Sequence, residues 1–510
     1  MNDFYKKTLP FLLIAFLLSV AIRLPTLNRP LAHHHEFCTV VVMTSLENWW
    51  DGGMTTYHCA PVMSWQNPTD KFINNGACST DKMIDKNGNY YYISHPPFAY
   101  YLPYFVFKII HQRPTLLGLE IINLLLNFIT ALFVYLIVGL LCIKKGRSKI
   151  FYPSFIAFCV YLFNPATLWF QSNVYMSDML VHVFFVIMVY ITLKMLMREK
   201  FNVPKYIIWY GIVLAMMCYT SWLGYVFVAV VIVYSFWKLQ FVSGFKTLIS
   251  VTVVVSVGIL ALTIYQYSQI NGLENYLLEM KSRYAVRGIV PRGVSGLFAN
   301  IWGVLVNIKN LLVNYVIHYN LIYLWLIGIF FFVMSKKKTN FVFTRNGYRF
   351  LILSGFTILF FHIIFLEYSH HDFSVLYGSL MLSVIVGILF HKILFTRRVK
   401  PRWINVSIIV MCSLMVIEFW VMNRAFDATQ KKQSSSYNNY NRLSNQKENV
   451  LFYLANKEDK MDLLSIYPYK RNVKNVSSIG EAQTFLRAHH QAKGYIINYE
   501  LTNISPEIIP

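Results

Sequence analysis

The chain has 510 residues, of which 56% are hydrophobic and 14% are charged, and its formal net charge is +23. Soluble domains carry about 25% charged residues, so this composition excludes an ordinary soluble protein. The basic residues stand in short loops between apolar runs and form no basic helix, so we expect no nucleic-acid partner.

The first predicted element is a transmembrane helix near the N-terminus. Lys6 and Lys7 precede an apolar run over residues 9–22. Ser19-Val20-Ala21 has the small-x-small pattern of a signal-peptide cleavage site, so a cleaved signal peptide is the alternative to an uncleaved first helix. Both interpretations place the chain after Arg23 on the outside of the membrane.

Ten further apolar runs follow, and a bilayer core needs about 20 such residues for each helix. The chain therefore predicts an all-α polytopic membrane protein with about 11 transmembrane helices. The ten runs cover residues 117–142, 150–169, 178–197, 206–221, 222–238, 247–267, 311–334, 349–366, 373–394 and 403–422.

The loop charges predict the topology. The short loops 170–177 and 367–372 contain no Lys or Arg, whereas four other loops are rich in them: 144–149, 194–205, 336–349 and 392–402. Basic loops stay in the cytoplasm. We therefore expect a multi-pass protein of the bacterial inner (cell) membrane, with a cytoplasmic N-terminus and a periplasmic C-terminus.

The chain after residue 422 changes in composition. Residues 431–447 are rich in Ser, Asn, Gln and Tyr and are typical of a linker. Beyond them we expect strands at 463–467 and 494–501 and a helix at 482–490. The sequence thus predicts two domains, a transmembrane domain over 1–422 and a small soluble periplasmic α/β domain over 423–510.

The outside loop over residues 23–115 carries the densest set of polar and aromatic residues. It contains His33-His34-His35-Glu36, an apolar stretch at 40–50 that predicts an amphipathic helix at the interface, and Tyr90-Tyr91-Tyr92 before His95-Pro96-Pro97. Cys38, Cys59 and Cys78 share this loop. A disulfide such as Cys59–Cys78 is one pairing, and the pairing stays open.

Two acidic clusters could carry chemistry. Glu36 is a candidate general base if it meets a hydroxyl, and the alternatives are a solvated loop residue or an acid at a helix N-terminus. Glu367, His370, His371 and Asp372 form the second cluster. His35 and Glu36 together with His370 and His371 could bind a divalent metal, although their spacing matches no metal signature, and hydrogen-bonded helix-end residues are the alternative.

A basic outside loop at 269–310 breaks the charge rule. Arg283 and Arg287 are four residues apart and share one face if they lie on a helix. With Lys281 and Arg292 they suit a phosphate, and general attraction to anionic lipids is the alternative. Asp178 opens a predicted helix, where an acid is either a cap or a functional carboxylate.

Taken together, these motifs resemble the GT-C glycosyltransferases, which are membrane enzymes that take a sugar from a polyprenyl-phosphate carrier. Over residues 1–395 the layout is similar to the branch of protein O-mannosyltransferases and lipid A aminoarabinose transferases. The matching motifs are His35-Glu36 after the first span, Pro96-Pro97 before aromatic residues, Ser177-Asp178, and His371-Asp372-Phe373. His35 stands where that family has its usual catalytic Asp.

The resemblance implies transfer of a sugar from a polyprenyl-phosphate donor to an acceptor hydroxyl on the outer face, with inversion. Its partners would be the donor lipid, membrane lipids, and an acceptor glycan, lipid or protein. No cofactor is certain, and a divalent metal is possible. The implied residues are Glu36, His35 and Asp178 for catalysis, His95, Arg283, Arg287 and Arg292 for the donor phosphate, and Tyr92, Trp50, His371 and Asp372 for substrate.

Two other functions remain open. A membrane transporter usually has charged or broken helices near the bilayer midplane, whereas here the ionisable residues gather at the predicted outer surface. A polysaccharide polymerase or ligase is the second alternative, for which we expect the large outside loop later in the chain. The transferred sugar and the acceptor are not specified by the sequence.

Overall fold

The computed structural model describes residues 2–31, 34–66, 82–142, 151–198, 203–239, 242, 244–289, 297–334, 344–396, 401–423, 450–454, 467, 470–488, 490, 493–496 and 502–504. The chain divides into two compact units. The bundle unit comprises residues 1–27, 120–261 and 282–422. The loop unit comprises residues 28–119, 262–281 and 423–510.

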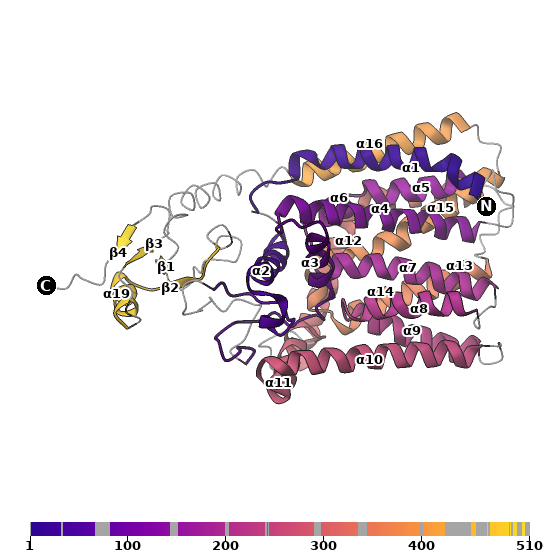
Figure 1. Ribbon diagram of the computed structural model, residues 1–510. Helices are drawn as coiled ribbons and strands as arrows, with labels where there is room; N and C mark the ends of the chain where they lie inside the picture. The colour runs from indigo at the N-terminus through magenta and orange to yellow at the C-terminus, as the bar shows by residue number, and fades with distance from the viewer. Residues whose placement is uncertain are drawn as a thin grey trace. The chain divides into compact units, whose positions relative to one another are not determined.

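Helices run lengthwise beside one another in the bundle unit (Figure 1). Helix α5 packs against α1 and α15, and α7 packs against α8. The helices that lie in this unit, wholly or in part, are α1 (Asn2–Arg23), α4 (Leu116–Leu141), α5 (Phe151–Phe163), α6 (Pro165–Phe170), α7 (Ser177–Arg198), α8 (Pro204–Cys218), α9 (Leu223–Lys238), α10 (Phe245–Asn271), α11 (Leu273–Arg287), α12 (Leu297–Met334), α13 (Arg345–Leu351), α14 (Thr357–Ile364), α15 (Leu376–Thr396) and α16 (Pro401–Asn423).

Eight of the eleven predicted transmembrane helices are confirmed, and the other three are present as shorter helices. Within the described ranges, eight helical segments are long and apolar enough to cross a membrane, and α5, α8 and α9 are shorter apolar helices. These eleven segments correspond one to one with the predicted spans. The chain is therefore a multi-pass membrane protein with an all-α membrane part.

Two predicted spans differ from the observed helices. The span at 150–169 is broken at Asn164, whose side chain accepts a hydrogen bond from the Thr167 N–H at 3.0 Å and so caps α6 at Pro165. Helix α12 begins at Leu297 rather than at residue 311, and its 38 residues extend over about 57 Å. The stretch before residue 311 is apolar enough to continue the helix despite Lys309.

The first long loop folds around a buried helix. Helix α2 (Phe37–Gly52) confirms the helix predicted at 40–50, but its residues from Cys38 to Trp49 are all buried. The helix is therefore buried on all its faces, so the prediction of an exposed polar face is wrong, and its position at the membrane interface stays a prediction. The rest of the loop covers it: the Ser45 hydroxyl donates to the Val62 carbonyl at 2.8 Å, and the Trp49 indole donates to the Ala60 carbonyl at 3.2 Å.

A buried carboxylate orders the hairpin that leads to the Tyr and His residues of this loop. Asp85 accepts hydrogen bonds from the Tyr91 hydroxyl at 2.6 Å and from the Asn89 amide at 2.7 Å. Burial raises the pKa of Asp85, but these hydrogen bonds outweigh it and the pKa lies below its usual value. The loop continues into helix α3 (Phe98–Ile109).

The C-terminal part of the loop unit is α/β, as predicted. Strands β1 (Val450–Leu454), β2 (Val473–Val476), β3 (Gly494–Ile496) and β4 (Thr502–Ile504) form one sheet in the order β2-β1-β3-β4. Strand β1 is parallel to β2 and β3, and β4 is antiparallel to β3. Helix α19 (Ile479–Ala488) packs Phe485 and Leu486 against Val450 and Phe452.

Two of the three predicted elements of the tail are confirmed, whereas Tyr467, the described end of the strand predicted at 463–467, lies in no strand. Helix α19 starts three residues before the predicted 482, and β3 covers the start of the strand predicted at 494–501. Residues 497–501 and 463–466 lie outside the described residues. The predicted domain boundary at 422 stays a prediction.

Asn472 joins the tail to the first loop within the loop unit. Its buried side chain accepts from the Trp65 N–H at 2.8 Å and donates to the Trp65 carbonyl at 2.9 Å. We expect Asn472→Ala to lower the free energy of local opening around Trp65 by about 2 kcal/mol, because two buried backbone groups lose their hydrogen-bond partners. Exchange of the Trp65 amide hydrogen should then quicken by about 30-fold. Asn475→Ala is the control, since the side-chain amide of Asn475 has no hydrogen bond within the described residues. Equal effects of the two variants on exchange of the Trp65 amide would contradict the role given to Asn472.

Candidate functional site

Asp178 lies in the first turn of α7 and is 1% exposed. The Tyr368 hydroxyl donates to its Oδ2 at 2.7 Å, and the Tyr377 hydroxyl donates to its Oδ1 at 2.6 Å. Tyr368 lies in the chain that connects α14 to α15, and Tyr377 lies in the first turn of α15. Asp178 thus holds the start of α7 to this connection and to the start of α15 inside the bundle unit.

The two arginines predicted to bind phosphate lie on one helix, α11, as expected. The Arg287 guanidinium lies 5.1 Å from the centre of the Tyr368 ring, within the range of a cation–π contact. The Glu367 N–H donates to the Gly288 carbonyl at 3.0 Å, directly after the helix ends. Arg283 is buried, with 8% of its surface exposed. Arg292, the third predicted arginine, lies outside the described residues.

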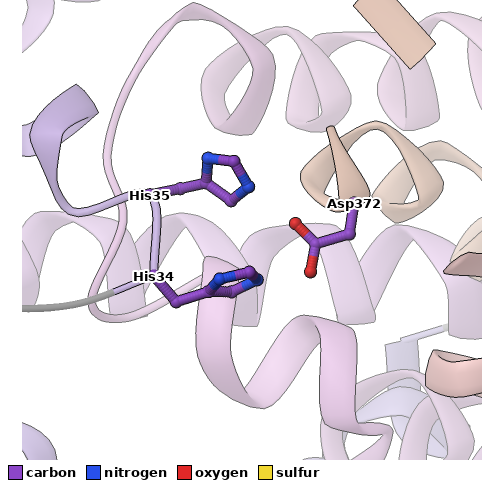
Figure 2. Close-up of side chains that lie close together, drawn as sticks. All are labelled: His34, His35 and Asp372. Atoms are coloured by element: carbon purple, nitrogen blue, oxygen red, sulfur yellow. The ribbon is translucent and has the colours of Figure 1, made fainter. Parts of the chain in front are cut away.

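The predicted His371-Asp372 motif lies in two short 3-10 turns, Tyr368–His370 and Asp372–Val375. The Asp372 carboxylate, drawn in Figure 2, is 3.0 Å from Nε2 of His318 on α12. The His371 ring stacks on Phe373 at 5.3 Å. The His370 side chain lies outside the described part of the chain.

Helix α12 contributes a row of polar contacts to the end of α14 and to the same connection. The Asn307 amide donates to the Glu367 carboxylate, and the Tyr315 hydroxyl is 3.0 Å from Nε2 of His362. With the His318–Asp372 pair these contacts fix residues 362–372 along one side of α12. Burial in an apolar bundle makes each such polar pair costly to break.

Glu36, the predicted base, is 1% exposed and stands directly before α2. Arg29 forms an ion pair with it: Arg29 Nη1 donates to Oε2 at 3.3 Å, and Nη2 contacts Oε1. Glu36 is therefore at a helix N-terminus, and it is not a solvated loop residue. Its side chain makes no capping hydrogen bond to α2.

His35, the other predicted catalytic residue, has an unusual backbone. Its φ is +59°, in the left-handed region that residues other than glycine rarely adopt. The His34 ring lies 4.6 Å from the His35 ring in the loop unit (Figure 2). Strained residues of this kind are concentrated at functional sites.

The strain at His35 gives a test that separates stability from function. We expect His35→Gly to match or exceed the thermal stability of the wild type, and His35→Ala to lose about 1 kcal/mol relative to Gly, because only Gly adopts this φ freely. If the imidazole takes part in the reaction, both variants lose activity. His34→Gly is the control, because His34 has an ordinary φ, and a stability gain there would contradict the argument.

Of the first-loop residues predicted to bind the donor phosphate or the sugar, His95 and Tyr92 lie close together, and Trp50 has a different neighbour. His95 is 2% exposed, and its backbone carbonyl accepts a hydrogen bond from the Tyr267 hydroxyl at 2.6 Å. Its ring lies 6.5 Å from that of Tyr92. Trp50 instead lies against Lys108, whose Nζ is 3.9 Å from the centre of the indole ring.

Sequence reasoning missed the residues that hold these side chains in place. Arg29, His318, Tyr368 and Tyr377 follow no motif or period. Of these four residues, only Tyr368 could have been suspected, because it directly follows Glu367 of the predicted acidic cluster. Of the predicted metal ligands, Glu36 is paired with Arg29 and His371 is stacked on Phe373, so a metal stays a prediction.

No family model and no curated protein sequence matches the chain. Solved structures do. Apo ArnT from Cupriavidus metallidurans is 11% identical, with a TM-score of 0.57 over 97% of this chain and 93% of that one. ArnT bound to undecaprenyl phosphate is 11% identical, with a TM-score of 0.55 over 96% and 88%.

The archaeal oligosaccharyltransferase AglB from Archaeoglobus fulgidus, in complex with an inhibitory peptide and a dolichol-phosphate, is also similar. It is 12% identical, with a TM-score of 0.51 over 96% of this chain and 70% of that one. Likeness at this identity establishes architecture. The chain therefore shares the fold of ArnT and of AglB along almost its whole length.

Proposed function

We propose that the chain is a membrane glycosyltransferase that moves a sugar from a polyprenyl-phosphate donor to an acceptor hydroxyl. The observation that carries this proposal is the fold shared along 97% of the chain with ArnT, a protein also solved with undecaprenyl phosphate bound. The arginine-bearing helix α11, whose last turn packs against the buried Asp178–Tyr368 pair, supports it, because such a lipid carries an anionic head.

The reaction needs side chains in two roles, one to take a proton and one to neutralise the leaving phosphate. The acceptor oxygen attacks the anomeric carbon while the bond from that carbon to the phosphate oxygen breaks, and attack from the opposite face inverts the centre. Glu36, with His35 beside it, takes the hydroxyl proton. Arg283, Arg287, Arg292 and His95 neutralise the departing lipid phosphate, which needs little acid assistance because it leaves as a stable anion.

Recognition of the sugar falls to aromatic and polar side chains. Tyr92 and Trp50 offer ring faces, and His371 and Asp372 offer hydrogen bonds. The donor tail explains why such an enzyme is embedded in a membrane. The chemistry takes place on the periplasmic face of a bacterial inner membrane, where the acceptor is a glycan, a lipid or a protein.

The decisive experiment uses the full chain reconstituted in liposomes. Purified protein is given a radiolabelled polyprenyl-phosphate sugar and a periplasmic extract as the acceptor source, with and without EDTA. Label should move from the lipid to the acceptor, and loss of transfer with EDTA would support a divalent metal. A strain lacking the protein should accumulate the lipid-linked sugar. Uptake of free sugar without bond formation would instead support a transporter.

A further inference from the structure

Asp178 does not present a free carboxylate to a reacting hydroxyl. Its two oxygens accept hydrogen bonds from Tyr368 at 2.7 Å and Tyr377 at 2.6 Å, and the residue is 1% exposed. What distinguishes Asp178 is the nature of its partners: both are phenol hydroxyls of residues at positions 368 and 377, and one of the two rings also contacts an arginine. This geometry suits a residue that orients Tyr368.

Tyr368 connects Asp178 to the arginine helix. Its hydroxyl is held by Asp178, and its ring lies 5.1 Å from the Arg287 guanidinium. A hydrogen bond from a phenol to a carboxylate moves electron density toward the ring, and a richer ring attracts a cation more strongly. The hydrogen bond also fixes the ring plane against which the guanidinium lies.

A second contact holds the end of α11 to the same residues. The Glu367 N–H donates to the Gly288 carbonyl at 3.0 Å. Arg287 and Tyr368 are each one residue away from this bond. The backbone contact sets the distance between helix and turn, and the ring sets the orientation of the guanidinium.

We propose that Asp178 and Tyr368 are positioning residues that hold Arg287 for the lipid phosphate of the donor. This inference rests on the proposed function and specifies how its phosphate site is built. A guanidinium fixed by a ring binds a phosphate with less loss of side-chain freedom than a mobile one. The Asp178–Tyr368 pair thus acts on donor binding through Arg287, and it takes no proton from the acceptor.

Tyr368→Phe is the sharpest variant, because it keeps the ring under Arg287 and removes only the hydroxyl bound to Asp178. We expect the donor KM to rise about 10-fold while kcat stays within about 2-fold, since the loss falls on binding. Asp178→Asn should act in the same direction. The double variant should be no worse than the stronger single variant, because both changes break one chain of contacts.

Tyr377→Phe is the matched control. It removes the equivalent hydrogen bond from the other oxygen of Asp178. The Tyr377 ring packs against Phe361, however, and against no arginine of the described residues. We expect it to change the donor KM by less than about 2-fold. Arg287→Lys keeps the charge and loses the planar group, so it should raise KM as Tyr368→Phe does, whether or not the tyrosine variant folds well.

Binding of undecaprenyl phosphate, measured by native mass spectrometry, distinguishes the two proposals. If the wild type binds no such lipid, the proposed function fails and this inference fails with it. If the wild type binds it and Tyr368→Phe and Arg287→Lys bind it equally well, only the inference fails. A large fall in kcat for Asp178→Asn at unchanged KM would also overturn it, because that result would make Asp178 a catalytic base.

Discussion

Replacing Glu36 by Gln is expected to lower sugar transfer by about 10² to 10⁴-fold, the usual contribution of a general base. Gln keeps the size of the side chain and can still accept hydrogen bonds from Arg29, but it cannot take a proton. The measurement is single-turnover transfer from a polyprenyl-phosphate sugar at saturating donor. The rate of the chemical step should fall while lipid binding stays near that of the wild type.

The ion pair with Arg29 supplies the control for this experiment. The Glu36 side chain is buried at 1% exposure and that of Arg29 is largely covered at 11%, so removing either partner leaves a poorly solvated charge unpaired. If Glu36 served only this pair, Arg29→Gln and Glu36→Gln would reduce activity alike. If Glu36 is the base, the double variant should regain stability without regaining transfer. Equal losses in the two single variants would disprove the base assignment.

Much of the fold follows from the order of apolar runs, because lipid forces each run to satisfy its own backbone as a helix. The break at Asn164-Pro165 was encoded locally, since proline begins helices and asparagine caps them. Strand β1 was missed, because its five residues have no turn signal that distinguishes them from a linker end. Its pairing with β2 and β3 depends on residues more than twenty positions away in sequence.

The candidate site was also predictable only where its residues are close together in the sequence. The spacing of Arg283 and Arg287 indicates one helix face, and α11 confirms that they lie on one helix. The partner of Asp178, by contrast, lies 190 residues away, and no period or motif relates the two positions. Glu36 shows the limit most clearly: its sequence neighbours are histidines, yet its ion-pair partner, Arg29, lies across a turn that contains the left-handed His35.

Replacing Arg23 by Met is expected to lower the free energy of unfolding by about 3 kcal/mol, because buried carbonyl groups lose their charged hydrogen-bond donor. Arg23 ends α1 and is fully buried, at 0% exposure. Its Nε donates to the Leu168 carbonyl and its Nη2 to the Thr167 carbonyl, both at 3.1 Å. Its Nη1 donates to Ser19 Oγ at 3.1 Å, and the Asn127 amide, turned with its oxygen toward the guanidinium, accepts from Nη2 at 2.8 Å.

Met fills a similar volume but donates none of these hydrogen bonds. The lost hydrogen bonds destabilise residues 167–173, which lead directly to Asp178. The same segment is also held by Asn173, whose side-chain amide donates to the Thr26 carbonyl at 2.6 Å. Thermal unfolding in detergent measures the effect. Arg113→Met is the control, since that side chain is 51% exposed and its shortest ion pair is with Asp51, which is 57% exposed. Arg23→Lys should recover part of the stability, because it keeps the charge without the planar fork. If Arg23→Met were as stable as the wild type, the helical hydrogen bonds of α6 would suffice for these carbonyls, and the arginine would have to be retained for another reason.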